Sequence, residues 1–330
     1  VVIPTYNSEK ILPLCLESIR GQDYPEGKLE IIVVDGGSED DTLEIAREYT
    51  DKIFSNPLKT GEAGKAVGVK KAEGDIIALI DSDNILPDKD WLKNMVEPFE
   101  DEEIAGTEPL FYTHRKKDCY ITRYCALIGM NDPLCLFLGN YDRYCLLTGR
   151  WTGLDVKQED AGDYLKIELD DKAIPTIGAN GFLIRRELLK LCSIDDYLFD
   201  IDIVYELVSQ GKNKFAKVKT GIIHIFSGSI STFARKQRRR IKDYAYYNQL
   251  GLRRYPWSEI SKKSLIKFLL YDILVIPLIV QALKGYTKKR DLSWFFHMPA
   301  CWVTLVVYGW GTIRNAVNVE EEDRGRWSQV

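Results

Sequence analysis

Short apolar runs and helical patterns alternate along the first hundred residues. Unbroken apolar runs at 1–3, 31–34 and 76–80 predict buried strands, because a strand covered on both faces shows no polar alternation. Between the first two runs, residues 11–19 carry apolar side chains at helical spacing, and residues 64–71 predict a further helix before the third run. This alternation is typical of a mostly parallel α/β sheet with flanking helices.

The pattern changes after about residue 110. Residues 110–171 are rich in Tyr, Cys and Leu and show no simple period. Further on, residues 175–189 predict a glycine-bearing turn, a short strand and a helix start, residues 195–211 an acidic cluster and a helix, and residues 222–226 a final strand.

Two apolar stretches close the chain, at Leu265–Leu283 and Trp294–Ile313. Each is about 20 residues long, which is the length needed to cross a bilayer. The first contains Asp272, and the linker between the two is basic. Two interpretations stay open: a membrane-associated hydrophobic hairpin or interfacial pair, and a buried helix pair of a soluble protein.

The charge along the chain is uneven. The formal net charge is −4, but residues 231–263 hold ten Lys and Arg against two acids. Such a basic block suggests an anionic partner, either a phosphate or a lipid surface, although a solvated helix face has the same composition. Nothing in the composition indicates a nucleic-acid partner.

Seven scattered cysteines without a C-x-x-C pair argue against a disulfide framework or a zinc site and fit a reducing compartment. The chain opens on "VVIPTYN", without Met and inside a predicted strand, and no signal peptide precedes that strand. We therefore expect a few N-terminal residues to be missing.

Acidic side chains follow two of the predicted strands. Asp35 ends the second run, and Asp81 and Asp83 follow the third in "IALIDSDN". Ligands of parallel sheets gather beyond the carboxyl ends of the strands. A D-x-D at such an end can hold Mg²⁺ or Mn²⁺ through carboxylate oxygens and leave positions open for a diphosphate.

Three segments resemble, in order and spacing, the nucleotide-binding half of family 2 glycosyltransferases. They are "VVIPTYNSE", "IIVVDGGSEDDT" and "GEAGKAVGVKKAEGDIIALIDSDN". The resemblance covers about the first 90 residues closely and continues more loosely to about Tyr244. It implies a GT-A fold and the transfer of a sugar from a nucleotide diphosphate sugar, with inversion at the anomeric carbon.

The resemblance also implies roles for single residues of this half. Asp35 would hydrogen-bond the base, and Lys65 would lie near the base or the phosphates. Asp81 would face the ribose or the metal, and Asp83 would be the principal metal ligand. The nucleoside pocket would be lined by Pro4, Thr5, Tyr6 and Glu9.

Inversion requires a carboxylate base across the sugar from the metal. The family usually supplies it in a Glu-Asp pair about eleven residues before a helix-ending glycine. Asp200 lies at that distance from Gly211, but Phe199 stands where Glu is customary. The base is therefore Asp200 or Asp202, and we favour Asp200.

Further residues resemble family positions on the acceptor side. Asn180 and Gly181 match a turn close to the donor sugar, although a plain strand-entry turn explains them almost as well. His224 matches a place near the metal or diphosphate, although a lone His in a strand is more often structural. Gln237 and Arg240 align with the Q-x-x-R-W of processive members, in which Ile241 replaces Trp, and could bind a diphosphate or a lipid phosphate.

These expectations combine into one hypothesis with alternatives. Residues 1–107 would form the nucleotide-sugar-binding half, 108–232 the acceptor-binding half, and 233–330 a basic segment with membrane-associated helices. The protein would be a metal-dependent inverting transferase at the cytoplasmic face of a membrane, using a UDP- or GDP-sugar and a lipid-linked or polysaccharide acceptor. The alternatives are a nucleotidyltransferase, a glycosidase and a catalytically inactive nucleotide-sugar-binding membrane protein.

Overall fold

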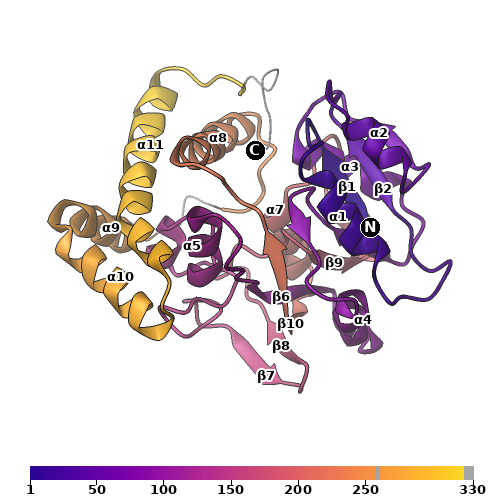
Figure 1. Cartoon of the computed structure of the whole chain (residues 1–330), viewed down its shortest axis with the longest axis horizontal. Coiled ribbons are helices and arrows are strands. Elements are labelled where there is room, and N and C mark those ends of the chain that lie inside the picture. The colour runs from indigo at the N-terminus through magenta and orange to yellow at the C-terminus, as the bar shows by residue number, and fades with distance from the viewer. Residues whose placement is uncertain (257–260, 323–330) are drawn as a thin grey trace. The chain divides into compact units, whose positions relative to one another are not determined.

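The computed structural model describes residues 1–256 and 261–322 (Figure 1). The expected segment 233–330 therefore includes residues, at 257–260 and 323–330, that lie outside the described part. The described residues form two compact units. The sheet unit consists of residues 1–113 and 155–224, and the helical unit consists of residues 114–154 and the described residues after 224.

A mixed sheet organises the sheet unit. Its strand order is β3-β2-β1-β4-β9-β6-β10-β8-β7, and β5 pairs with β10 outside this path. Within the path, β9 and β8 run against the other strands. The strands are β1 (Val2–Thr5), β2 (Ile32–Asp35), β3 (Ile53–Ser55), β4 (Ile76–Leu79), β5 (Asn84–Ile85), β6 (Gly106–Tyr112), β7 (Lys157–Asp160), β8 (Tyr164–Glu168), β9 (Phe182–Arg185) and β10 (Lys214–His224).

Helices cover this sheet. A Cβ at Gly68 would lie 2.2 Å from Val2 Cγ1, so only glycine allows α3 to pack this closely on β1. The strands β1, β2 and β4 have fully or mostly buried side chains, as their unbroken apolar runs predict. The helices of the sheet unit are α1 (Leu12–Arg20), α2 (Thr42–Arg47), α3 (Gly61–Lys71), α4 (Trp91–Val96) and α7 (Asp200–Ser209), with the 3-10 helices η1 (Glu97–Glu100) and η2 (Arg186–Leu191).

The helical unit is built around aromatic side chains. Tyr124, Phe233, Trp294 and Phe296 are buried in one apolar cluster, and edge-to-face ring contacts join Phe296 to Tyr124 and Phe233. Its helices are α5 (Tyr120–Ile128), α6 (Leu134–Leu138), α8 (Ile230–Gln249), α9 (Lys262–Leu274), α10 (Ile276–Lys288), the 3-10 helix η4 (Leu292–Phe296) and α11 (His297–Val317).

The first apolar stretch near the C-terminus is not one helix. It breaks at Val275, where φ is 63°, and α9 and α10 meet at 91°. Pro277 lies in the first turn of α10, where its missing N–H is tolerated. Among the described residues, one helical segment, Leu292–Ala316, has the length and hydropathy of a membrane span, and the α9–α10 pair would be a second if counted as one broken span.

Candidate active site

The carboxyl ends of β2, β1 and β4 lie side by side in the sheet. The parallel register pairs Thr5 with Asp35, and the amide of Ile80 donates to the Val2 carbonyl. Asp81 therefore follows β4 at the same edge at which Asp35 ends β2. The prediction that strand-end acids gather at one edge of the sheet holds for these two residues.

Asp35 orders the loop that follows β2. Its carboxylate is 4% exposed and accepts hydrogen bonds from the amides of Gly37 (2.8 Å) and Ser38 (2.9 Å) and from the hydroxyls of Ser38 (2.6 Å) and Thr5 (3.0 Å). A carboxylate offers about four acceptor positions. A base N–H that binds Asp35 would therefore replace one of these bonds, most simply that of a rotatable hydroxyl.

The other residues expected around the nucleoside lie in and after β1. Pro4, Thr5 and Tyr6 are buried, and the Lys59 ammonium lies 5.3 Å from the centre of the Tyr6 ring. Glu9 is partly exposed and accepts from the amide of Asp41 at 3.4 Å. The four residues thus share one end of β1, and their contact with a nucleoside stays a prediction.

Lys65 links two acids that are far apart in the sequence. Its Nζ atom lies 2.9 and 3.0 Å from the two carboxylate oxygens of Asp200, 135 residues away, and 3.3 Å from Asp81 Oδ1. The Lys65 side chain is 5% exposed, whereas the side chains of Asp81 and Asp200 are 29% and 24% exposed. One buried cation thus faces two carboxylates that remain open to solvent.

These neighbours control the protonation of both partners. Burial raises the pKa of Asp200 to about 7, Lys65 opposes this rise, and the charge of Asp81 adds to it. Burial acts to lower the pKa of Lys65, but the charges of Asp200 and Asp81 outweigh burial and hold it above its ordinary value. Asp200 therefore has a pKa close to neutral pH, as suits a general base.

Helix α7 carries both candidate bases in its first turn. Asp200 is its first residue, and Asp202 is buried with 4% exposure. Asp200 is therefore the more open of the two to solvent. The choice of Asp200 as the base stays a prediction.

A strand pairing brings His224 to the D-x-D segment. β5 runs antiparallel to the end of β10, so that Asn84 lies opposite His224. The His224 Nε2 atom is 3.4 Å from Asp83 Oδ1, and the imidazole lies against the Tyr112 ring with 5.6 Å between ring centres. The fold thus brings the carboxylate of Asp83 and the imidazole of His224 together, although the two residues are 141 positions apart in the sequence.

Asn84 and Tyr112 were not predicted, and they hold this region together. The Asn84 side-chain amide donates to Asp83 Oδ1 (3.3 Å) and Asn180 Oδ1 (3.1 Å), and its oxygen accepts from the Asp81 amide. The Asn180 amide in turn donates to the Tyr112 hydroxyl at 3.2 Å. Asn84 directly follows D-x-D in the sequence, and this position alone could have indicated that it contacts the site.

Asn180 and Gly181 form a left-handed turn next to these residues. Their φ angles are 53° and 90°, and a Cβ at Gly181 would lie 2.6 Å from Ile222 Cδ1. The Gly181 amide donates to the Leu79 carbonyl of β4 at 3.1 Å. The turn is thus held against the strand that precedes Asp81, and its predicted place near the donor sugar stays a prediction.

A fully buried ion pair supports the same turn. Lys217 Nζ lies 2.6 Å from Glu108 Oε2, and both side chains are 0% exposed. The other oxygen of Glu108 accepts from the Gly178 amide at 2.9 Å, and the Gly178 backbone packs on that of Asp200. Nothing in the sequence pointed to this pair, because single charges in strands usually mark a solvated face.

Gln237 and Arg240 lie on α8 in the helical unit. Gln237 Nε2 (2.8 Å) and Arg240 Nη1 (3.1 Å) both donate to the Asn131 carbonyl, and Arg240 also donates to Gln237 Oε1. The Tyr308 hydroxyl adds a contact to Gln237 Oε1 at 3.1 Å. These polar groups stabilise the helical unit, and phosphate binding by them stays a prediction.

The side chains around Asp83 can be compared with the ligands that a divalent cation prefers. Within the described residues, no group of three or more acidic, His or Cys side chains is close enough to enclose a metal ion. Mg²⁺ and Mn²⁺ sites that bind diphosphates need only one or two protein ligands, and Mn²⁺ accepts imidazole as well as carboxylate. Asp83 and His224 fit such an open site with two protein ligands, and a metal role for Asp81 stays a prediction.

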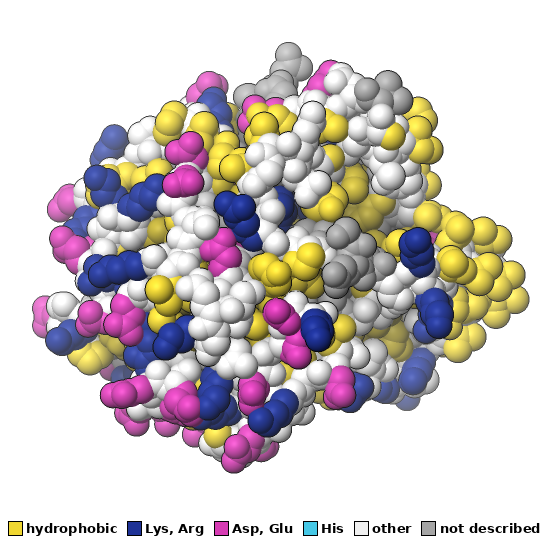
Figure 2. Space-filling view, turned by 180° about the vertical axis from the view of Figure 1, so that it is seen from behind, with side chains coloured by type: hydrophobic (Ala, Val, Ile, Leu, Met, Phe, Trp, Pro, Cys, Tyr) yellow, Lys and Arg dark blue, Asp and Glu magenta, His cyan; other side chains and the backbone are white. Residues whose placement is uncertain are grey.

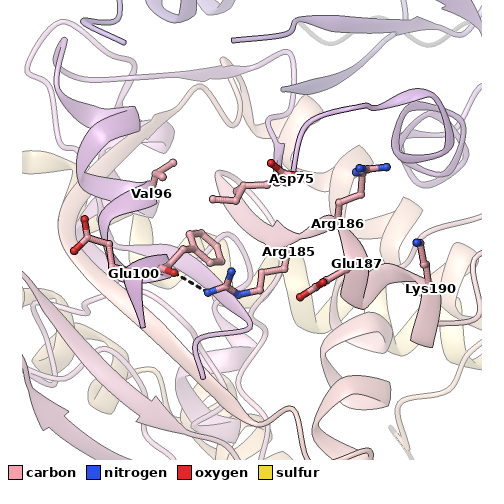
Figure 3. Close-up of a pocket in the computed structure, with 9 residues that line it drawn as sticks. Asp75, Val96, Glu100, Arg185, Arg186, Glu187 and Lys190 are labelled. Atoms are coloured by element: carbon pink, nitrogen blue, oxygen red, sulfur yellow. Dashed lines mark hydrogen bonds between the residues drawn. The ribbon is translucent and has the colours of Figure 1, made fainter. Parts of the chain in front are cut away.

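A separate pocket lies at the opposite ends of the central strands. It has a volume of about 570 Å³ and is lined by residues at the start of β4 and the end of β9 (Figure 3). Arg185 Nη2 donates to the carbonyls of Phe99 (2.7 Å) and Asp101 (3.1 Å), so its charge already has partners. The remaining lining mixes acids, such as Asp75 and Glu187, with bases, and it contains none of the predicted site residues.

Comparison with known proteins adds three findings. Residues 1–124 match the family model described as Glycosyl transferase family 2. A dolichyl N-acetyl-alpha-D-glucosaminyl phosphate 3-beta-D-2,3-diacetamido-2,3-dideoxy-beta-D-glucuronosyltransferase of Methanococcus voltae is 36% identical over 116 residues, which are 33% of this chain and 35% of that protein. The poly(ribitol-phosphate) beta-N-acetylglucosaminyltransferase TarS of Staphylococcus aureus is 38% identical over 100 residues, which are 28% of this chain and 17% of that protein.

A solved structure extends the likeness beyond these segments. The mannosyltransferase PcManGT from Pyrobaculum calidifontis, in complex with GDP-Man and Mn²⁺, superposes with a TM-score of 0.52 at 15% identity and covers 96% of this chain and 86% of its own. This likeness concerns the fold. The sequence matches span about a third or less of the length of the two curated relatives.

Proposed function

We propose that this protein is a family 2 glycosyltransferase that transfers a sugar from a nucleotide diphosphate sugar with inversion, because residues 1–124 match that family model and the chain shares its fold with a mannosyltransferase. One observation carries the proposal. Lys65 contacts both Asp81 of the D-x-D segment and Asp200. A carboxylate with a pKa of about 7 therefore lies beside the strand-end acids, where a donor would bind.

The donor would bind along the carboxyl edge of β2, β1 and β4. Its nucleoside would meet Pro4, Thr5, Tyr6, Glu9 and Asp35. Asp83 and His224, with Asp81, would hold a Mg²⁺ or Mn²⁺ ion, whose charge offsets that of the leaving diphosphate. The structure of PcManGT in complex with GDP-Man and Mn²⁺ supports this donor class.

Asp200 would act as the general base. As an acceptor hydroxyl oxygen bonds to the anomeric carbon, its proton passes to the Asp200 carboxylate, and the bond from that carbon to the diphosphate oxygen breaks. Lys65 fixes the Asp200 carboxylate through both oxygens and balances the charge of Asp81. The Asn180–Gly181 turn would position the sugar between these groups.

The acceptor would be lipid-linked or a polysaccharide, at the cytoplasmic face of a membrane. The names of the Methanococcus and Staphylococcus relatives describe a dolichyl phosphate-linked saccharide and poly(ribitol-phosphate). The basic helix α8, with Gln237 and Arg240, would bind the acceptor phosphate. A sugar-binding but inactive protein is the second candidate, because Phe199 replaces the customary Glu beside Asp200.

A screen of UDP- and GDP-sugars with Mn²⁺ and membrane lipid extract tests the proposal. We expect release of nucleoside diphosphate by wild type and its loss in Asp83→Ala, with retention in the exposed control Asp196→Asn. Binding of a nucleotide sugar without any release or transfer would favour the inactive protein and overturn the proposal.

A further inference from the structure

The corner between α9 and α10 exposes a continuous set of large apolar side chains. We call it the elbow surface and define it by Ile266 (57% exposed), Leu270 (49%), Ile273 (65%), Leu274 (59%), Ile276 (70%) and Val280 (56%). Figure 2 shows hydrophobic side chains gathered over these helices, in yellow at the right of the view. Monomeric proteins in water rarely expose an apolar patch of this kind unless it binds something.

Both helices are apolar on more than one side. In α10, Leu278, Ala282 and Gly285 form a buried stripe at helical spacing, while Ile276 and Val280 point away from it. In α9, Phe268 and Asp272 are buried in the same way, and the elbow residues cover the other sides. The helical unit covers only the buried stripes, so the large apolar residues on the other sides face solvent.

Cationic side chains stand at both outer ends of the elbow and are absent from its corner. Lys262, Lys263 and Lys267 are exposed in the first part of α9, and Lys284 and Lys289 are exposed at the end of α10. Figure 2 shows dark-blue side chains along the border of the yellow surface. An apolar corner between two lysine-bearing ends matches a leaflet with an acyl interior and anionic headgroups.

The geometry favours a position within one leaflet. Each helix has 13 residues, so each is about 20 Å long, which is shorter than the hydrocarbon core of about 30 Å. The 91° bend prevents the two from forming one straight span. The buried Asp272 would also be unfavourable at the centre of a bilayer.

We propose that the elbow surface docks on an anionic phospholipid leaflet, with its corner among the acyl chains and its lysines at the headgroups, and without crossing the bilayer. The inference rests on the membrane location proposed above and specifies the surface, the lipid and the depth. An interfacial site of this kind would hold the protein where a lipid-linked acceptor presents its phosphate.

Co-sedimentation of the full chain with vesicles tests this inference. The vesicles are phosphatidylcholine alone, or phosphatidylcholine with phosphatidylglycerol, at low and high salt. We expect wild type to bind the anionic vesicles, and Ile273→Glu/Ile276→Glu to bind at least about tenfold more weakly, because the change removes two apolar side chains from the corner and places charges there. The matched control Leu58→Glu/Leu191→Glu changes two exposed leucines of the sheet unit and should bind as wild type does.

A second variant keeps the test independent of the apolar residues. Lys263→Gln/Lys267→Gln should weaken binding to anionic vesicles by about fivefold or more, because both lysines would be attracted to the anionic headgroups. Equal binding to neutral and anionic vesicles, or no vesicle binding with a switch from dimer to monomer in Ile273→Glu/Ile276→Glu, would each overturn the proposal.

The readout is separate from sugar transfer. If the transferase proposal fails, wild type still partitions to anionic vesicles. If the docking proposal fails, nucleoside diphosphate release from a nucleotide sugar remains while vesicle binding is absent or insensitive to the elbow variants.

Discussion

Two buried lysines of the sheet unit, Lys65 and Lys217, have opposite surroundings. Lys217 pairs with the carboxylate of Glu108, and both side chains are sealed from solvent. Lys65 meets two carboxylates, Asp81 and Asp200, that are each about a quarter exposed. The sealed pair is balanced in charge and holds a turn, whereas the open cluster keeps excess negative charge and a titratable group facing the solvent. The buried charge thus supports the structure in one case, and in the other it belongs to the site that we propose to be catalytic.

Breaking the sealed pair should have the largest effect on stability. Lys217→Met leaves the Glu108 carboxylate buried without its ammonium, and we expect the free energy of unfolding to fall by about 3–5 kcal/mol. Chemical denaturation measures this. The double variant Glu108→Gln/Lys217→Met should recover most of the loss, because Gln can still accept from the Gly178 amide. An unchanged unfolding midpoint for Lys217→Met would contradict the distinction between the two lysines.

Asp272 provides a buried carboxylate with no lysine at all. It is 4% exposed, none of the described residues hydrogen-bonds its side-chain oxygens, and burial raises its pKa from 3.8 to about 6. A raised folded-state pKa stabilises the protonated form, so stability is lost as pH rises through 6. We expect Asp272→Asn to raise the free energy of unfolding at pH 8 by about 2–3 kcal/mol and to change it little at pH 3.5. An equal effect at both pH values would mean that ionisation of Asp272 is not the cause.

The open cluster of Lys65, Asp81 and Asp200 should set the pH dependence of catalysis. Because Asp200 must be ionised to accept a proton and has a pKa of about 7, kcat/KM should rise with pH up to about 7 and fall about tenfold per unit below it. Lys65→Met removes the cation that lowers this pKa, so the acidic limb should move to higher pH. Initial rates across pH for both proteins measure this. A limb that stays in place in Lys65→Met would separate Lys65 from the protonation of Asp200.

A surface lysine gives the smallest effect and serves as the reference. Lys52 pairs with Glu30 and Glu73 while 45% of its side chain is exposed. We expect Lys52→Ala to lower the free energy of unfolding by less than about 1 kcal/mol and to leave transfer unchanged. A loss as large as that of Lys217→Met would show that burial does not set the size of these effects.

The sequence predicted the strands and the acids at their ends because local patterns encode both. Apolar runs gave the core of β1, β2 and β4, and Asp35 and Asp81 follow from the ends of such runs. The approach of Asp200 to Asp81 depends on a tertiary contact between α7 and α3, and only the family resemblance anticipated it. The pair of Glu108 and Lys217 depends on neighbouring strands that are buried on both faces, for which a lone charge carries no local signal.

The apolar stretch at 265–283 shows a second limit of prediction from the sequence. Its composition predicts one long helix, whereas the chain bends at Val275 just before the turn that contains Pro277. Proline has no N–H to bond to the carbonyl four residues earlier, here that of Ile273, and its ring clashes with that carbonyl, so the sequence held a signal for a helix break near Val275 but not for its angle. The angle matters because a straight helix of this length could span a bilayer, whereas we propose that the bent pair lies at its interface.

Transfer by Asp200→Asn is the most direct test of the account. The substitution keeps the shape of the side chain and removes its ability to accept the acceptor's proton. With Mn²⁺, a nucleotide sugar that wild type uses and the lipid acceptor, we expect the rate of glycosylated product formation to fall by about 10²–10⁴-fold, while the exposed control Asp196→Asn remains active. Full transfer by Asp200→Asn would contradict the assignment of the open cluster as the catalytic centre.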